Sequence, residues 1–134
     1  MSVRVTISNG PLGPWLGGDA VAGAGALVWF EGVVRGVEDG RVLLALDYEV
    51  YEPMASLQLA RIANEAVGKH ALLALDVQHS RGTVAVGEVS LRVRIASAHR
   101  RAALEAMGEF LDRLKRDVPI WKKPVFPDDT TATA

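Results

Sequence analysis

The feature that most constrains the fold is a change of hydrophobic period near residue 98. Residues 88–95 alternate between polar and apolar side chains, which is the period of a half-buried strand. The apolar members are Val89, Leu91, Val93 and Ile95. Residues 99–117 then carry an apolar stripe at helical spacing, formed by Ala103, Met107, Phe110, Leu111 and Leu114. The sequence therefore predicts a strand followed by a sheet-covering helix, with Ser97 as its N-terminal cap.

The first third of the chain has the pattern of strands and turns. Residues 3–7 alternate and predict a short opening strand. Residues 25–34 and 41–51 are rich in β-branched and aromatic side chains and flank a turn at residues 38–40. These two segments are predicted to pair as a hairpin.

A first long helix is predicted over residues 53–67. Pro53 suits the first turn of a helix, and Gly68 suits a position just after its end. Its predicted apolar stripe comprises Ala55, Leu59, Ile62, Ala63 and Ala66. Residues 71–77 and 83–86 are predicted to form two short strands.

The C-terminal segment cannot continue the last helix. Pro119 ends that helix, and a second proline at position 124 makes residues 119–126 a non-helical, ordered arm. Residues 127–134 are small and polar and are predicted to be disordered. The whole pattern predicts an α+β fold with mainly antiparallel pairing and two principal helices, in one domain over residues 1–126.

Composition narrows the function. Fifteen basic and sixteen acidic residues leave a net charge of −1, which does not favour a nucleic-acid or membrane-surface binder. The chain has no cysteine, so thiolate metal sites and thiol nucleophiles are excluded and a cytoplasmic protein is expected. His79 has no second histidine at ligand spacing, so no metal site is predicted. The apolar runs are too short to span a bilayer.

Lysines cluster around the predicted end of the last helix, at Lys115, Lys122 and Lys123. Lys115 follows Leu111 by four residues, so it falls on or beside the apolar stripe, and partial burial there would lower its pKa. Such a lysine can act as a base or nucleophile. An equally simple interpretation is a cation that interacts with the helix dipole. For Lys122, spacing alone favours an ordinary exposed charge.

Three other residues occupy positions that are suited to binding an anion. His99 and Arg100 fall in the first turn of the last helix, where free backbone N–H groups and the dipole favour a phosphate. Arg35 follows an apolar strand just before a turn, where it could hold an anion. Solvated surface positions are the alternative for all three residues.

Taken together, several segments in order resemble the large, catalytic subunit of molybdopterin synthase over nearly the whole chain. These are residues 30–35 (FEGVVR), 48–55 (YEVYEPMA), 86–88 (VGE), 97–100 (SAHR), 114–115 (LK) and 119–123 (PIWKK). The resemblance implies a hammerhead-like α/β subunit and a sulfurtransferase of molybdenum cofactor biosynthesis. Its substrate would be cyclic pyranopterin monophosphate, and no cofactor is implied.

The resemblance also implies partners and residue roles. A small ubiquitin-like subunit with a C-terminal thiocarboxylate would supply sulfur, and two large subunits would form the centre of a heterotetramer, with a pocket built from both. Lys115 and Lys122 would be catalytic. The residues that would contact substrate are Val33, Val34, Arg35, His99, Arg100, Lys115, Lys122 and Lys123.

Two departures from the family pattern leave alternatives open. Pro124 stands where the family usually has an acidic residue, and residues 79–82 (HSRG) place an arginine one position later than usual, on the opposite face of a strand. The first alternative is a non-catalytic paralogue that binds a pterin or the ubiquitin-like partner. A second alternative, motivated only by the cluster of cationic side chains, is a general phosphate- or RNA-binding α+β domain, which the near-zero net charge disfavours.

Overall fold

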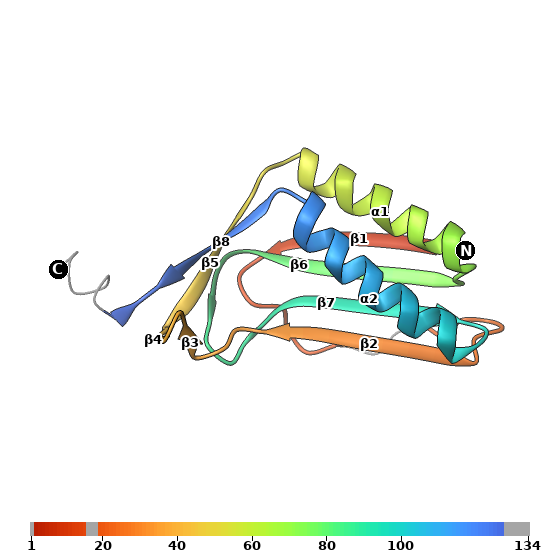
Figure 1. Ribbon diagram of the computed structural model, residues 1–134, viewed down its shortest axis with the longest axis horizontal. Coiled ribbons are helices and arrows are strands. Elements are labelled where there is room, and N and C mark those ends of the chain that lie inside the picture. The colour runs from red at the N-terminus through yellow and green to blue at the C-terminus, as the bar shows by residue number, and fades with distance from the viewer. Residues whose placement is uncertain (1, 16–18, 128–134) are drawn as a thin grey trace.

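A computed structural model describes residues 2–15 and 19–127, and Figure 1 shows two helices side by side on one face of a sheet. The helices are α1 (Met54–His70) and α2 (Arg100–Asp117). The strands are β1 (Ser2–Asn9), β2 (Ala26–Val33), β3 (Val37–Glu38), β4 (Arg41–Val42), β5 (Ala45–Val50), β6 (Ala74–Ala85), β7 (Val89–Ser97) and β8 (Ile120–Val125).

The six-stranded sheet has the order β2-β7-β6-β5-β8, and β1 also pairs with β6. Only the pairing of β1 with β6 is parallel among the described strands. β1 and β5 follow one another along the same edge of the long strand β6, because residues 74–81 pair with β1 and residues 82–85 pair with β5. The predicted α+β class with mainly antiparallel pairing is confirmed.

The main core lies between the helices and the sheet. Val93 and Ile95 of β7 are fully buried there, as the alternation predicts. The helices contribute a buried stripe that largely matches the predicted one: Ala55, Leu59, Ile62, Ala63 and Val67 of α1, and Ala103, Ala106, Met107, Phe110 and Leu114 of α2. Burial of these apolar side chains is the main force that holds α2 across the sheet.

The predicted long hairpin is wrong. β2 pairs with β7, while β5 pairs with β6 and β8. The turn itself is present: Asp39 and Gly40 both have positive φ, as a tight hairpin turn requires, but it joins only the two-residue strands β3 and β4. Val28 and Phe30 of β2 pack on the helical core, which β7 also reaches, so burial outweighs proximity in sequence.

Three predicted element boundaries also need correction. Gly68 lies inside α1, and the C-cap of this helix is Ala71, which has a left-handed conformation. Ser97 does not cap α2: its hydroxyl donates to the carbonyl oxygen of His99, and His99 takes the N-cap position. The predicted strands 71–77 and 83–86 are not separate: residues 74–77 and 83–85 both belong to β6, because Gly82 with φ +84° bends the strand without ending it.

The ordered C-terminal arm is the edge strand β8, which lies beside β5 (Figure 1). Tyr51 N–H donates to the Pro119 carbonyl oxygen at 3.1 Å, so Tyr51 and Pro119 form a hydrogen-bonded pair of the antiparallel ladder. Hydrogen-bonded and non-hydrogen-bonded pairs alternate along such a ladder, and the pair of Pro124 with Leu46 is therefore a non-hydrogen-bonded one. The missing N–H of Pro124 faces away from β5, which an edge strand tolerates. Pro124 therefore does not interrupt the arm. Apart from Pro127, the predicted tail of residues 127–134 lies outside the described residues.

In the described part of the chain, no helix is long and apolar enough to cross a membrane.

Candidate active site

A cavity of about 370 Å³ opens where the C-terminal end of α2 faces β5 and β8. Figure 1 shows this end of α2 beside the two strands that stand away from the rest of the sheet. Leu46, Leu114 and Ile120 form part of its apolar lining. The polar lining comes from seven elements or their flanks, and its members are Arg35, Glu38, Tyr48, His79, Ser90, Lys115 and Lys122.

Three cations meet at this cavity although they are far apart in sequence. Lys115 comes from the last turn of α2, Lys122 from β8, and Arg35 from the segment after β2. None of the three forms an ion pair with a residue in the described ranges. Glu38 is the only carboxylate among the lining residues. The cavity therefore carries excess positive charge, which suits an anionic ligand.

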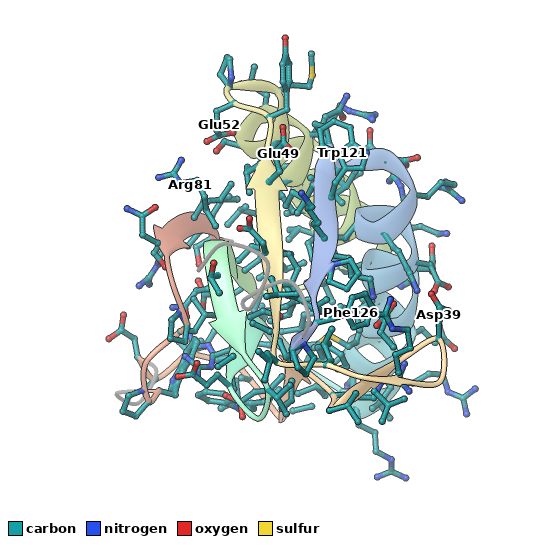
Figure 2. The ribbon with its side chains drawn as sticks, turned by 90° about the vertical axis from the view of Figure 1, so that its left-hand side faces the viewer. Asp39, Glu49, Glu52, Arg81, Trp121 and Phe126 are labelled. Carbon is teal, nitrogen blue, oxygen red and sulfur yellow. The ribbon has the colours of Figure 1, made fainter. Side chains whose placement is uncertain are left out.

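The register of β8 decides which lysine enters the cavity. Lys122 lies opposite Tyr48 of β5, on the face that lines the cavity, and Lys123 lies opposite Asp47 on the other face. Figure 2 shows the outer face of these two strands, with Glu49 and Trp121 labelled. Within one chain, Lys123 is thus separated from the other predicted site residues.

Of the two valines predicted to contact substrate, only one lines the cavity. Val33 lines the cavity, whereas Val34 is buried in a small second core with Leu43, Leu46 and Val84. The Val34 N–H donates to the Glu88 carbonyl oxygen at 3.0 Å, and its own carbonyl oxygen accepts from Gly87 N–H at 2.9 Å. Val34 therefore holds the segment that carries Arg35.

The predicted burial of Lys115 is not found in the single chain, where its side chain is exposed at the edge of the cavity. Lys115 lies in the last turn of α2, immediately after Leu114, which is the last buried residue of this helix. Its position on the apolar stripe directs it to the cavity, but the described residues leave it accessible to water.

His99 and Arg100 do not reach this cavity within one chain. They lie at the start of α2, whereas Lys115 lies at its end. Fifteen residues of helix separate Arg100 from Lys115, or about 22 Å along the axis. Figure 1 shows α2 running from the right-hand side of the molecule to its middle, where the chain continues into β8. Both residues are exposed.

The floor of the cavity contains polar residues that the sequence did not indicate as a group. The Tyr48 hydroxyl and Ser90 Oγ are 2.9 Å apart, and the Tyr48 ring lies edge-on to the His79 ring at a centroid distance of 5.2 Å. Burial raises the pKa of Tyr48, and repulsion from Glu38 acts in the same direction. Only the pairing of β5, β6 and β7 brings these three side chains together.

His79 is buried, with 4% of its surface exposed, and its Nδ1 is 2.7 Å from the carbonyl oxygen of Ser80. Burial lowers the pKa of its imidazole, and the hydrogen bond to that carbonyl partly opposes the shift. Arg81, the arginine displaced in the sequence, is exposed and donates to Asn9 Oδ1 at 2.9 Å. It takes no part in the cavity.

A second cavity, of about 330 Å³, lies on the sheet face opposite the helices. Its arginines are largely neutralised by nearby carboxylates. Arg94 contacts Asp76 at 2.9 Å, Arg92 contacts Glu31 at 2.7 Å, and Arg4 contacts Asp19 at 3.4 Å. These pairs explain its charge without a ligand, so the cationic cavity is the better candidate site. Residues 2–15 and 19–127 contain no cluster of three or more side chains suited to a metal ion.

The fold and the cationic cavity define a class: an α+β protein with a site for an anionic substrate at the junction of a helix end and a sheet edge. A model of the MoaE protein family matches residues 17–117, and the chain belongs to that family.

Similar proteins agree with this assignment. The chain is 45% identical over 105 residues to a molybdopterin synthase catalytic subunit of Oryza sativa subsp. indica, covering 78% of this chain and 54% of that protein. It thus spans about half the length of that relative. The chain is 43% identical over 102 residues to the subunit of the same name from Thermoplasma volcanium, and the match covers 76% of this chain and 74% of that protein. The crystal structure of molybdopterin synthase from Staphylococcus aureus superimposes with a TM-score of 0.75 at 33% identity, covering 80% of this chain and 78% of that one.

Proposed function

We propose that this protein is the catalytic subunit of a molybdopterin synthase, a sulfurtransferase of molybdenum cofactor biosynthesis. It would act on cyclic pyranopterin monophosphate and install the two dithiolene sulfurs. The observation that carries this proposal is the convergence of Lys115, Lys122 and Arg35 on one cavity. Two of these three residues are the lysines that the family resemblance marks as catalytic.

The charge of the cavity suits the proposed substrate. A cyclic phosphate requires cationic donors, and Arg35 with the two lysines supplies them without competing ion pairs in the described ranges. Transfer of sulfur from a thiocarboxylate develops negative charge on oxygen and sulfur. Lys115 and Lys122 can stabilise that charge and donate protons.

The sulfur donor would be the C-terminal thiocarboxylate of a small ubiquitin-like partner. The chain itself has no cysteine, so the sulfur must come from outside it. The cavity is bordered by β8, an edge strand, and its open side exposes Lys115 and Lys122. An extended tail could reach both lysines there without unfolding the core. The reaction would take place in the cytoplasm.

A complete site would need a second copy of this chain. His99 and Arg100 are predicted to contact substrate, yet they lie about 22 Å along α2 from Lys115. A two-fold dimer can bring the start of one α2 to the cavity of its neighbour. The proposed assembly is therefore a central dimer of this chain with one small subunit at each end.

The competing function is a non-catalytic paralogue that binds a pterin or the small partner. Its main support was Pro124, which was expected to disturb the C-terminal arm. The pairing of β8 with β5 continues through Pro124, so the arm is not interrupted there. The cavity also retains both lysines. These observations favour an active enzyme.

The test is conversion of purified cyclic pyranopterin monophosphate in the presence of a thiocarboxylated small partner, followed by mass spectrometry of pterin and partner. We expect a pterin product that has gained two sulfurs and a partner that has returned to its carboxylate form. A well-folded protein that binds the partner but yields no product would overturn the enzymatic assignment. It would favour the paralogue.

A further inference from the structure

His79 occupies the floor of the cationic cavity in a defined orientation. Its Nδ1 lies 2.7 Å from the carbonyl oxygen of Ser80. A carbonyl oxygen only accepts hydrogen bonds, so Nδ1 must carry the hydrogen. In the neutral ring, Nε2 then has a free lone pair, and it is the ring nitrogen left for the cavity that His79 lines.

The surroundings of His79 favour the neutral ring. The charged and titratable groups that line the same cavity are Lys115 from α2, Lys122 from β8, Arg35 after β2, Glu38 from β3 and Tyr48 from β5. Within the described ranges, no carboxylate forms an ion pair with His79. Burial lowers the pKa of the ring, and the hydrogen bond to the Ser80 carbonyl oxygen only partly opposes this shift.

The other polar groups of the cavity are poorly suited to accept a proton. Lysine ammonium and arginine guanidinium groups are donors without a lone pair. The Tyr48 hydroxyl already shares a hydrogen bond with Ser90 Oγ at 2.9 Å. Glu38 is the only carboxylate of the lining, and its element β3 belongs to the separate two-stranded sheet.

We propose that His79 is the general base of this site and that its Nε2 accepts a proton from water during release of the small partner. This inference rests on the proposed function, because attack of the thiocarboxylate sulfur on the pterin would leave an acyl link between the partner's C-terminal carbonyl carbon and that sulfur. Water attacks that carbonyl carbon and passes one proton to Nε2, and the carbon–sulfur bond breaks. The products are a pterin thiolate and the partner's carboxylic acid, which then ionises to the carboxylate, so that both protons of the water leave to solvent.

The neighbouring cations complement this role. Lys115 and Lys122 can stabilise the oxyanion and the departing thiolate, while His79 withdraws the proton from water. The hydrogen bond from Nδ1 to Ser80 fixes the tautomer, so the same nitrogen is available in every cycle. One cavity thus provides separate acid and base groups.

The test compares His79→Gln and His79→Asn with the wild-type chain, each assayed with the thiocarboxylated partner and the precursor. The glutamine amide can occupy the place of Nε2, and the asparagine amide can still donate to the Ser80 carbonyl, but neither accepts a proton near neutral pH. We expect kcat to fall about 10²-fold in both variants, with KM unchanged. His70→Gln is the matched control, because His70 contacts Glu109 on the helical surface away from the cavity, and it should retain wild-type kcat.

Two further readouts separate a base from a structural residue. The acidic limb of the kcat profile should disappear in His79→Gln, and mass spectrometry should detect accumulated partner–pterin adduct. Nitrogen NMR of the wild-type chain should show an Nδ1-protonated neutral ring that titrates below the ordinary histidine pKa. Wild-type kcat and pH profile in His79→Gln, or a ring protonated at Nε2, would overturn the proposal. Inactive wild-type protein would instead refute the proposed function, and the NMR result would still test the tautomer.

Discussion

The hydroxyl of Tyr48 lies 2.9 Å from Ser90 Oγ and joins β5 to β7 across the strand β6 between them. Ser90 is buried, so loss of the phenol leaves a hydroxyl without this partner. We expect Tyr48→Phe to lower the free energy of unfolding by about 1–2 kcal/mol, measured by urea denaturation. Tyr51→Phe is the control, because Tyr51 is 61% exposed and should unfold like the wild type. Equal stabilities of the two variants would show that the bond contributes nothing.

Lys115→Ala should abolish conversion of the precursor with little change in stability. Lys115 is exposed, so its removal should alter the free energy of unfolding by under about 1 kcal/mol. Turnover should fall at least about 10²-fold, because the proposed role of this lysine is to stabilise charge that develops during sulfur transfer. The matched control is Lys69→Ala, which removes a surface ion pair with Glu109 and should keep full activity. Retained turnover in Lys115→Ala would contradict the assigned role.

Lys122 and Lys123 are adjacent but lie on opposite faces of β8. Because only Lys122 lines the cavity, Lys122→Ala should reduce turnover far more than Lys123→Ala. Steady-state assays of the two variants under identical conditions provide the comparison. Equal losses would indicate that Lys123 reaches substrate in the assembled enzyme.

Mixing two inactive variants tests whether the site is shared between chains. If His99 and Arg100 of one copy complete the cavity of the other, Lys115→Ala and His99→Ala should complement one another. With random pairing, half of the dimers would be mixed and each would hold one intact site, so about a quarter of the wild-type activity should return. No recovery after subunit exchange, verified by native mass spectrometry, would mean that each site is built by one chain.

Acid should destabilise the protein through His79. Burial lowers the folded-state pKa of His79 below its ordinary value of 6.5, so the unfolded chain binds more protons as the pH falls through that value. The free energy of unfolding should therefore decrease as the pH falls below about 7, until the pH falls below the folded-state pKa. His79→Gln should show a smaller decrease over the same window, measured by urea denaturation at several pH values. A steeper decrease in the variant would contradict the burial argument.

Pro124→Ala should leave both stability and activity close to those of the wild type. Pro124 occupies a position of β8 whose N–H would face away from β5, so alanine gains no ladder hydrogen bond. The free energy of unfolding should change by about 1 kcal/mol or less, mainly through the unfolded state. A large change in urea denaturation would show that Pro124 distorts the arm.

Much of the fold could be predicted because it depends on local periodicity. The alternation of residues 88–95 and the apolar stripes of the two helices predict the elements and their buried faces, and burial at Val93, Leu59 and Phe110 agrees. Strand partners could not be predicted in this way. The Asp39-Gly40 turn favours a hairpin, but the pairing of β2 with β7 depends on packing under α2, which no local pattern describes.

The fold class followed from the sequence alone, and so did the choice of the two lysines and Arg35 as candidate site residues. Tertiary structure decided which candidates meet. The register of β8 turns Lys122 into the cavity and Lys123 away, and the length of α2 keeps His99 far from Lys115. Strand pairing also places His79 and Tyr48 together on the cavity floor. The physical reason is that residues distant in sequence become neighbours only when strands pair and a core forms.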